Sequence, residues 1–267
     1  MLLSLSERPV IAHRGNSVRA PENTLESLRQ GLASGADAVE FDVRLTRDGQ
    51  VVVHHDPTID RTSDGTGAVR DTTLAELRMR DYGFRYTRDG GATHPWRGRR
   101  ISIATLAEVL ELLPFAPFVL EVKAPDAAAE TLRLLHYHGA RARCIVGSFH
   151  LAALAPFRAA GFATGAARAE VVQLLLRAAR PGGPARVPFQ ALLITPRFRG
   201  LPLPVRRLAR MARAAGVPTH VWTVDDAAQA RRLWAHGVQG MISNDPAAIV
   251  AAAGRAPEAM TGRPPTP

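Results

Sequence analysis

The sequence predicts an α/β protein built as one closed barrel of eight parallel strands, a TIM (β/α)8 barrel. First, short runs rich in Val, Ile and Ala alternate with longer stretches whose apolar residues recur at helical spacing. Second, several of the helical stretches end at glycine, a common residue just past a helix end. Third, the chain has 267 residues, and such barrels typically form from about 250 residues as a single domain.

Strands and helices are expected to alternate along the whole chain. The expected strands are Val10–His13, Ala38–Val43, Phe118–Lys123, Cys144–Phe149, Phe162–Ala167, Ala191–Thr195, Thr219–Val224 and Gly240–Ser243. The expected helices are Thr24–Ser34, Thr105–Leu113, Ala127–His138, Leu151–Ala160, Glu170–Ala179, Val205–Ala215, Asp226–His236 and Pro246–Ala253. Eight strands, each followed by a helix, imply a closed parallel barrel.

Two segments fall outside this alternation. Residues 56–100 are polar and rich in turn residues, with one helical stretch at about Thr73–Arg80, and they are expected to form a small cap inserted after the second strand. Residues 254–267 contain four prolines and no apolar period, so a disordered tail is expected. The barrel domain is therefore expected to span residues 1–253.

Three features of the sequence bear on the cellular compartment in which the protein is expected. No apolar run approaches the roughly 20 residues that span a bilayer, so stable membrane insertion is not expected. The apolar start is limited to Leu2 and Leu3, too short for a secretory signal. The single cysteine, Cys144, excludes an intramolecular disulfide. A cytoplasmic location is expected.

Charge is concentrated in one stretch. The net charge is +10, and residues 168–213 carry ten arginines and a single acid, Glu170. Nucleic-acid binding is not expected, since only Phe189 and Phe198 are aromatic there and no helix-turn-helix or finger pattern is present. A solvated basic face is the simpler interpretation. Weak attraction of anionic substrates or lipid surfaces is the functional alternative.

Two carboxylates are expected on the inner face of the second strand. Residues two apart on a strand share a face, so Glu40 and Asp42 point together. Asp48-Gly49 is a strong signal for a two-residue hairpin loop. Such a loop would place Asp42 opposite His55, which predicts that His55, rather than its neighbour His54, shares the carboxylates' face.

Neighbouring strands contribute similar residues. Glu121 and Lys123 share a face of the third strand, and Lys123 is the only lysine beside 33 arginines. His13 and Arg14 end the first strand. Catalytic groups of such barrels gather at the carboxyl ends of the strands, so these side chains are expected to meet at one rim.

The residue types at this rim indicate a reaction. The three carboxylates, with no cysteine, suit a hard cation such as Mg²⁺ or Ca²⁺. Arg14 and Lys123 beside that cation suit a phosphate, and His13 and His55 can act as general acid and base. Together these groups predict metal-dependent cleavage of a small-molecule phosphodiester.

Several motifs resemble the glycerophosphodiester phosphodiesterase family. They are His13-Arg14-Gly15, Pro21-Glu22-Asn23-Thr24, Glu40-Phe41-Asp42-Val43, Thr46-Arg47-Asp48-Gly49, His55-Asp56, Leu120-Glu121-Val122-Lys123, Ser148-Phe149 and Val221-Trp222-Thr223-Val224. The resemblance covers residues 10–250 and implies a TIM barrel that hydrolyses glycerophosphodiesters to glycerol 3-phosphate and an alcohol.

The resemblance also implies roles for individual residues. His13 and His55 correspond to the acid–base pair, and in the family the substrate's own hydroxyl is proposed to attack phosphorus, giving a cyclic phosphate that water opens. The metal ligands would be Glu40, Asp42 and Glu121, the phosphate-binding cations Arg14 and Lys123, and the aromatic wall beside the glycerol Trp222. One departure is Asn244, where the family often carries an acid, so no role is implied for it.

Two alternatives stay open. A lysophospholipase-D-like activity on the same site would use the apolar segment 201–204 at the rim to hold an acyl chain. A metal-binding or regulatory barrel without activity is the other, although all five of the metal and acid–base positions are present. The other histidines, at positions 94, 136, 138, 150, 220 and 236, have no comparable neighbours in the sequence.

Overall fold

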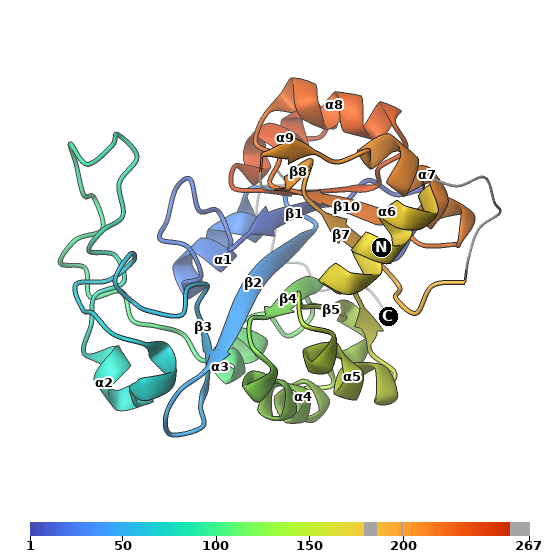
Figure 1. Cartoon of the computed structure of the whole chain (residues 1–267). Coiled ribbons are helices and arrows are strands. Elements are labelled where there is room, and N and C mark those ends of the chain that lie inside the picture. Colours follow the sequence, from blue (N-terminus) through green and yellow to red (C-terminus); the bar gives the residue numbers. More distant parts are fainter. Residues whose placement is uncertain (179–185, 199, 257–267) are drawn as a thin grey trace.

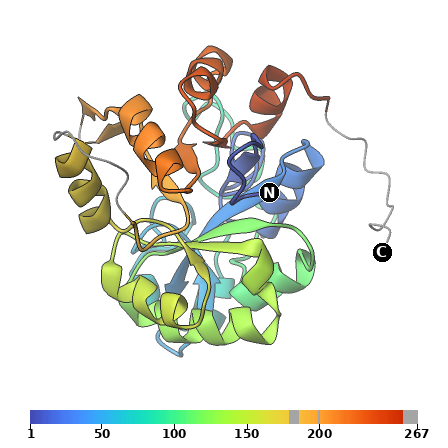
Figure 2. The ribbon, with the colours of Figure 1, turned by 90° about the vertical axis from the view of Figure 1, so that its right-hand side faces the viewer.

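The computed structural model describes residues 1–178, 186–198 and 200–256. Eight parallel strands curl into a barrel with helices outside it (Figures 1 and 2). The strand order is β6-β5-β4-β2-β1-β11-β10-β7, and a parallel bridge between Gly165 and Ala191 joins the two ends. The strands are β1 (Val10–His13), β2 (Ala38–Leu45), β4 (Phe118–Val122), β5 (Cys144–Gly147), β6 (Ala163–Thr164), β7 (Leu192–Ile194), β10 (Thr219–Trp222) and β11 (Gly240–Ser243). The predicted (β/α)8 barrel is confirmed.

The outer helices follow the predicted order. They are α1 (Leu25–Ala33), α3 (Leu106–Leu112), α4 (Ala128–Tyr137), α5 (Leu151–Ala159), α6 (Arg168–Ala178), α7 (Val205–Ala214), α8 (Ala227–Ala235) and α9 (Pro246–Ala252), with short 3₁₀ turns at Pro125–Ala127 and Ala140–Arg143. Threonines begin two of them, because the side chains of Thr24 and Thr105 accept hydrogen bonds from the first turns of α1 and α3. Gly35 follows α1 in the left-handed region, with φ of 85°.

Each barrel strand separates two apolar layers. Inside the barrel, Ile11, Val119, Ile145 and Ile242 pack together with Leu2, which comes from the chain's beginning. Outside, the alternate residues of the strands pack against the helices in two further clusters. The inner residues nearer the carboxyl ends of the strands are polar, so charged and titratable side chains gather at that end of the barrel.

The β2 hairpin has a different register from the prediction. β2 pairs with β3 (Val51–Val53), with Val43 opposite Val53. Thr46 N–H donates to the oxygen of Gln50, so the loop has three residues, 47–49, instead of two. Asp42 therefore lies opposite His54, whose backbone N–H donates to the backbone oxygen of Asp42. The predicted pairing of Asp42 with His55 is wrong.

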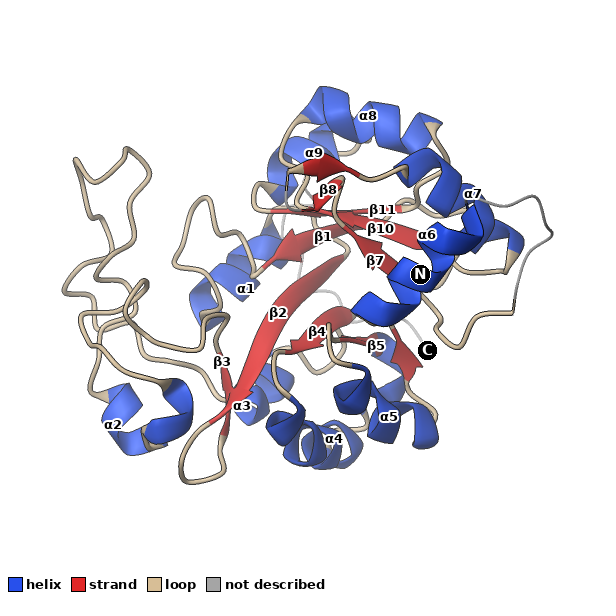
Figure 3. Ribbon diagram, viewed as in Figure 1, coloured by secondary structure: helices blue, strands red, loops and turns tan. Residues whose placement is uncertain are grey.

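The insertion follows this hairpin and forms its own small core. It contains a 3₁₀ turn, Val69–Asp71, and the helix α2 (Leu74–Arg78), which the sequence predicted at Thr73–Arg80. Its loops extend to one side of the barrel (Figure 3). Ile59, Val69, Leu77 and Tyr82 of the insertion form this buried cluster with Val52 of β3 and with Ile103. Trp96 donates its ring N–H to the oxygen of Arg19, which ties the insertion to the β1–α1 loop.

Several smaller features complete the comparison with the sequence. The strand predicted at Phe162–Ala167 is only two residues long, and a hairpin of β8 (Arg197–Phe198) and β9 (Leu201–Pro202), which was not predicted, precedes α7. Four arginines of the basic stretch, at positions 206, 207, 210 and 213, are exposed on α7. Most of the predicted tail, residues 257–267, lies outside the described residues. Among the described residues, no helix is long and apolar enough to cross a membrane.

Candidate functional site

A pocket opens at the carboxyl ends of the barrel strands. Seven of the eight residues singled out in the sequence line it, namely His13, Arg14, Glu40, His55, Glu121, Lys123 and Trp222. The eighth, Asp42, is almost fully buried beside them. Val119, Gly147, Ser148, Phe149, Ala166, Leu193 and Ile242 complete the lining. The barrel thus brings together residues from strands far apart in the sequence.

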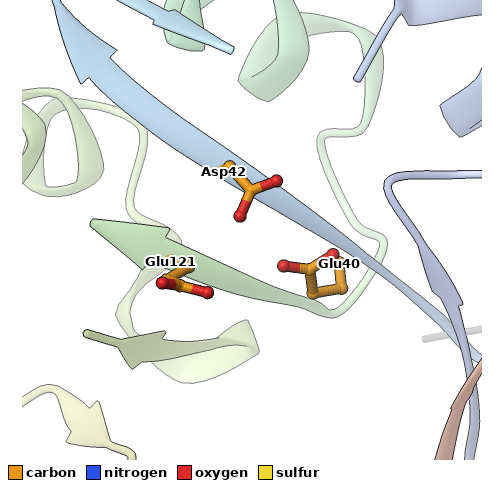
Figure 4. Close-up of side chains that lie close together, drawn as sticks. All are labelled: Glu40, Asp42 and Glu121. Carbon is orange, nitrogen blue, oxygen red and sulfur yellow. The ribbon is translucent and has the colours of Figure 1, made fainter. Parts of the chain in front are cut away.

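Three carboxylates form the centre of this pocket. Oxygen atoms of Glu40, Asp42 and Glu121 all lie within 4.8 Å of one another, from the adjacent strands β2 and β4 (Figure 4). The parallel pairing sets Asp42 beside Glu121. Burial and the charge of Asp42 raise the pKa of Glu40 well above its ordinary value. Burial and the same charge also raise the pKa of Glu121.

Two cations offset part of this negative charge. Lys123 Nζ lies 3.0 Å from both Asp42 Oδ1 and Glu121 Oε1, and Arg14 Nε lies 3.3 Å from Asp42 Oδ2. Burial alone would raise the pKa of Asp42, but Lys123 and Arg14 outweigh it and hold this pKa well below the ordinary value. Asn23 Nδ2 also donates to Asp42 Oδ2, at 2.9 Å.

Arg14 reaches this position through an unusual backbone. Its φ is 55°, a left-handed value that is uncommon outside glycine and is often found at functional sites. Gly15 follows with φ of 81°, and a Cβ there would come within 2.3 Å of the Ser27 backbone. The tight turn lets the Arg14 N–H donate to Glu40 Oε2 at 3.0 Å. The sequence His-Arg-Gly therefore sets both a side chain and a backbone donor at the site.

His13 sits on the inner face of β1. Its Nε2 lies 3.9 Å from Glu40 Oε2, and its Nδ1 lies 2.7 Å from Asn244 Oδ1. Burial, followed by the charge of Arg14, lowers the pKa of His13. The imidazole is therefore biased toward its neutral form.

His55 reaches the pocket for a different reason from the one predicted. β3 ends at Val53, so the alternation of strand faces does not continue to His54 and His55. His54 is buried against the insertion, with Nε2 3.0 Å from Thr58 O, and it packs edge-on against Tyr82. His55, and not His54, lines the pocket.

A series of linked ion pairs fixes the position of His55. Its Nδ1 lies 2.6 Å from Asp56 Oδ1. Arg61 then joins the other oxygen of Asp56, at 2.5 Å, to both oxygens of Glu22, at 2.7 Å each. Glu22 also accepts from Arg14 Nη1 at 2.8 Å. Despite burial, Arg61 and Arg14 lower the pKa of Glu22 to about 2.

Two aromatic rings line one wall of the pocket. Trp222 and Phe149 meet edge to face, with centroids 6.1 Å apart. The guanidinium of Arg168 lies over the ring of Phe149, 5.3 Å from its centroid. This wall gives the pocket an apolar surface in addition to its charged residues.

Sequence reasoning missed several residues that hold the site. Glu22 and Asn23 stand in a quoted motif but were given no role, although their position two and one residues before Thr24, the N-cap of α1, was a usable signal. Asp56, Arg61, Asp225 and Asn244 were also given none. Asp56 follows His55 directly in a quoted motif, which was a usable signal. Asn244 contacts His13 from 231 positions away, so spacing gave no signal for it.

The carboxylate cluster fits a divalent metal ion. All three donors are oxygens and two are buried, and burial together with the charge of Asp42 raises the pKa values of Glu40 and Glu121. Three hard oxygen ligands suit Mg²⁺ or Ca²⁺, as opposed to a structural zinc site with cysteine ligands. The side chains of Arg14, Lys123, His13 and His55 lie beside them. The fold and the site define a barrel hydrolase that acts on phosphoric diesters.

Comparisons with known proteins identify the family. The sequence model of the glycerophosphoryl diester phosphodiesterase family matches residues 13–248. A glycerophosphodiester phosphodiesterase of Caldanaerobacter subterraneus is 30% identical over 254 residues, which cover 90% of this chain and 96% of the relative. One of Bacillus subtilis is 29% identical, over 92% of this chain and 86% of the relative. The chain belongs to the glycerophosphoryl diester phosphodiesterase family.

Solved structures agree. A phosphodiesterase of Oleispira antarctica in complex with the product sn-glycerol-3-phosphate has a TM-score of 0.74, with 29% identity over 92% of this chain and 96% of that chain. A glycerophosphodiester phosphodiesterase from Agrobacterium tumefaciens has a TM-score of 0.73, with 26% identity over 91% and 99% of the two chains. The family resemblance seen in the motifs is therefore confirmed.

Proposed function

We propose that the chain hydrolyses glycerophosphodiesters to glycerol 3-phosphate and an alcohol. The observation that carries this proposal is a pocket at which three clustered carboxylates adjoin Arg14, Lys123 and two histidines. A cation site beside phosphate-binding side chains and titratable groups suits phosphoryl transfer. The related Oleispira structure, which holds sn-glycerol-3-phosphate, supports the choice of product.

One divalent cation, Mg²⁺ or Ca²⁺, is the proposed cofactor. Its ligands are Glu40, Asp42 and Glu121, whose oxygens are gathered within 4.8 Å. When bound, the cation supplies positive charge that stabilises negative charge developing on phosphoryl oxygens. It also relieves the repulsion among these carboxylates.

The remaining residues orient the substrate and move protons. Arg14 and Lys123 bind the phosphate, and the indole of Trp222 packs beside the glycerol, with Phe149 behind it. Of the two histidines, one accepts the proton of the attacking hydroxyl and the other donates a proton to the leaving alcohol oxygen. His13 and His55 both reach the pocket, from β1 and from the end of the β2 hairpin.

We also infer the domain organisation expected from the sequence, with residues 1–253 as one barrel domain and 56–100 as its cap. The support is the buried cluster that four residues of the insertion form with Val52 and Ile103, and the hydrogen bond from Trp96 to the β1–α1 loop. The cytoplasmic location and weak contact with anionic surfaces stay predictions.

Release of glycerol 3-phosphate tests the function directly. Purified protein is incubated with glycerophosphocholine or glycerophosphoethanolamine, with Mg²⁺, with Ca²⁺, or with EDTA. Product is expected only when a divalent cation is present, and a His13→Ala variant should release at least about 10²-fold less. Equal rates in EDTA would overturn the metal requirement.

A second substrate in the same assay addresses the alternative activity. Hydrolysis of lysophosphatidylcholine without release of glycerol 3-phosphate from glycerophosphocholine would replace the proposal with a lysophospholipase-D-like function. Inertness toward all three substrates, with His13→Ala indistinguishable from the parent protein, would favour a barrel without activity.

A further inference from the structure

His13 has a hydrogen-bond partner that the sequence left without a role. Asn244 follows β11, and its Oδ1 lies 2.7 Å from His13 Nδ1. The hydroxyl of Ser17 also donates to this oxygen, at 2.9 Å. An imidazole nitrogen can either donate or accept, so the direction of the bond depends on which atom of the amide faces the ring.

Asp225 determines that direction. Asn244 Nδ2 lies 2.8 Å from Asp225 Oδ2, and a carboxylate can only accept. The Asn244 backbone N–H, at 2.7 Å, and the Ser243 hydroxyl, at 3.0 Å, hold the other oxygen of Asp225 in place. Rotating the amide by 180° would set its oxygen against the carboxylate, two acceptors at hydrogen-bond distance, and would cost the hydrogen bond to Asp225.

The oxygen of Asn244 therefore faces His13 and requires a donor there. We propose that Asn244, oriented by Asp225, is a positioning residue that fixes neutral His13 as the tautomer protonated on Nδ1. The unprotonated Nε2 then faces the pocket, 3.9 Å from Glu40 Oε2. The kinetic consequence rests on the proposed role of His13 in proton transfer, whereas the tautomer itself does not.

The two pocket histidines are thus held in different ways. His55 Nδ1 meets a carboxylate, Asp56, directly. His13 instead contacts the neutral amide of Asn244. The carboxylate of Asp225, which does not touch His13, sets the orientation of this amide. A change at Asp225 should therefore alter His13 alone, and His55 serves as a control within the same molecule.

Nuclear magnetic resonance of the ring nitrogens tests the tautomer. The ¹⁵N-histidine-labelled protein, saturated with Mg²⁺ and at a pH where both rings are neutral, is expected to carry the His13 proton on Nδ1. Asp225→Asn should allow the amide to turn, and Asn244→Leu removes the acceptor, so both variants should move part of the His13 population to the Nε2–H tautomer. The signals of His55 should not change.

An exchange of the two side chains provides a rescue. In the double variant Asp225→Asn/Asn244→Asp, the new carboxylate accepts from His13 while the new amide can donate to it. The Nδ1–H tautomer should return. A parent protein with the proton on Nε2, or single variants that leave the tautomer unchanged, would overturn the proposal.

Kinetics with glycerophosphocholine supply the second measurement. Asp225→Asn should lower kcat by roughly 10-fold or more, with a smaller change in KM, because a misplaced proton removes part of the 10²–10⁴-fold contribution of a positioned acid or base. The double variant should recover most of that loss. If the parent protein cleaves no glycerophosphodiester, the proposed function fails while the tautomer result still decides this inference.

Discussion

His54 and His55 are adjacent residues in opposite surroundings. His55 lines the pocket with its Nδ1 on Asp56, whereas His54 is buried against Tyr82 in the insertion. His55→Ala should lower kcat by about 10²–10⁴-fold, as expected for loss of a positioned acid or base. Steady-state kinetics with glycerophosphocholine measure this.

His54→Ala is the matched comparison. It removes a buried ring and its bond to Thr58, so the free energy of unfolding should fall by about 1–3 kcal/mol. The rate per folded molecule should stay within a few-fold of the parent. A large loss of kcat in His54→Ala with a small one in His55→Ala would reverse the assignment.

The carboxylate cluster makes a prediction about binding alone. Mg²⁺ or Ca²⁺ should raise the unfolding temperature, since a cation at 100 times its Kd stabilises the folded state by about 2.7 kcal/mol. Glu121→Gln should reduce this shift, measured by thermal unfolding. Glu130→Gln, on the outer face of α4 and paired with Arg133, is the control and should keep it.

Individual residues of the site differ in how far the sequence predicts them. Glu40 and Asp42 follow from spacing on one strand, and Lys123 stands out as the only lysine. Asn244 and Asp225 do not, because their roles arise from hydrogen bonds made only after the last two strands join the first. Local pattern carries no information about such contacts.

Among the elements, the insertion and the β1–α1 loop are joined by Arg61. It bonds Asp56 and both oxygens of Glu22. Arg61→Lys keeps the charge but loses the fork, so His55 should be held less well and kcat/KM should fall by roughly 10-fold. The control is Arg88→Ala, which changes an exposed arginine of the same insertion and should match the parent protein. Kinetics of both variants are measured at 0.1 and 0.5 M salt.

The β2 hairpin shows why element type is easier to predict than register. Asp48-Gly49 suits a two-residue loop, but a glycine with positive φ also suits a three-residue loop. The structure has the latter, with φ of 75° at Gly49. The side chains of β2 still face as predicted because pairing with β1 and β4, and packing of Val39, Phe41 and Val43 in the outer cluster, fix them independently of β3.

At the scale of the whole molecule, His220 should make stability depend on pH. It lies inside the barrel with Nε2 2.8 Å from Leu2 O, and burial lowers its pKa to about 4. Unfolded, it titrates near 6.5. Between those values the unfolded chain binds a proton that the folded one does not, so this contribution is complete above pH 6.5 and lost as pH falls toward 4.

Denaturant unfolding at several pH values measures this effect. The parent protein should lose about 1.4 kcal/mol per pH unit from this residue within the window. His220→Gln lacks the titrating ring, so the difference between the two proteins should change with pH there and stay constant above pH 7. A constant difference throughout would mean that His220 is protonated in the fold.

The fold as a whole was predictable because the apolar residues of the strands and helices recur at the spacing of each element, and because residues such as glycine mark where helices end. The hairpin β8–β9 was not, since two-residue strands carry no periodic pattern. β6 is shorter than expected. After Thr164, only an isolated bridge between Gly165 and Ala191 continues its pairing.

The pairing of β1 with β11 has a consequence for synthesis on the ribosome. β1 is complete at residue 13, yet one of its edges pairs only with residues 241–243. While the intervening chain emerges, that edge offers unpaired backbone groups to any other strand. Nascent chains and products truncated before residue 240 should therefore depend most on chaperones, and crowded polysomes are where this protein is most exposed to aggregation.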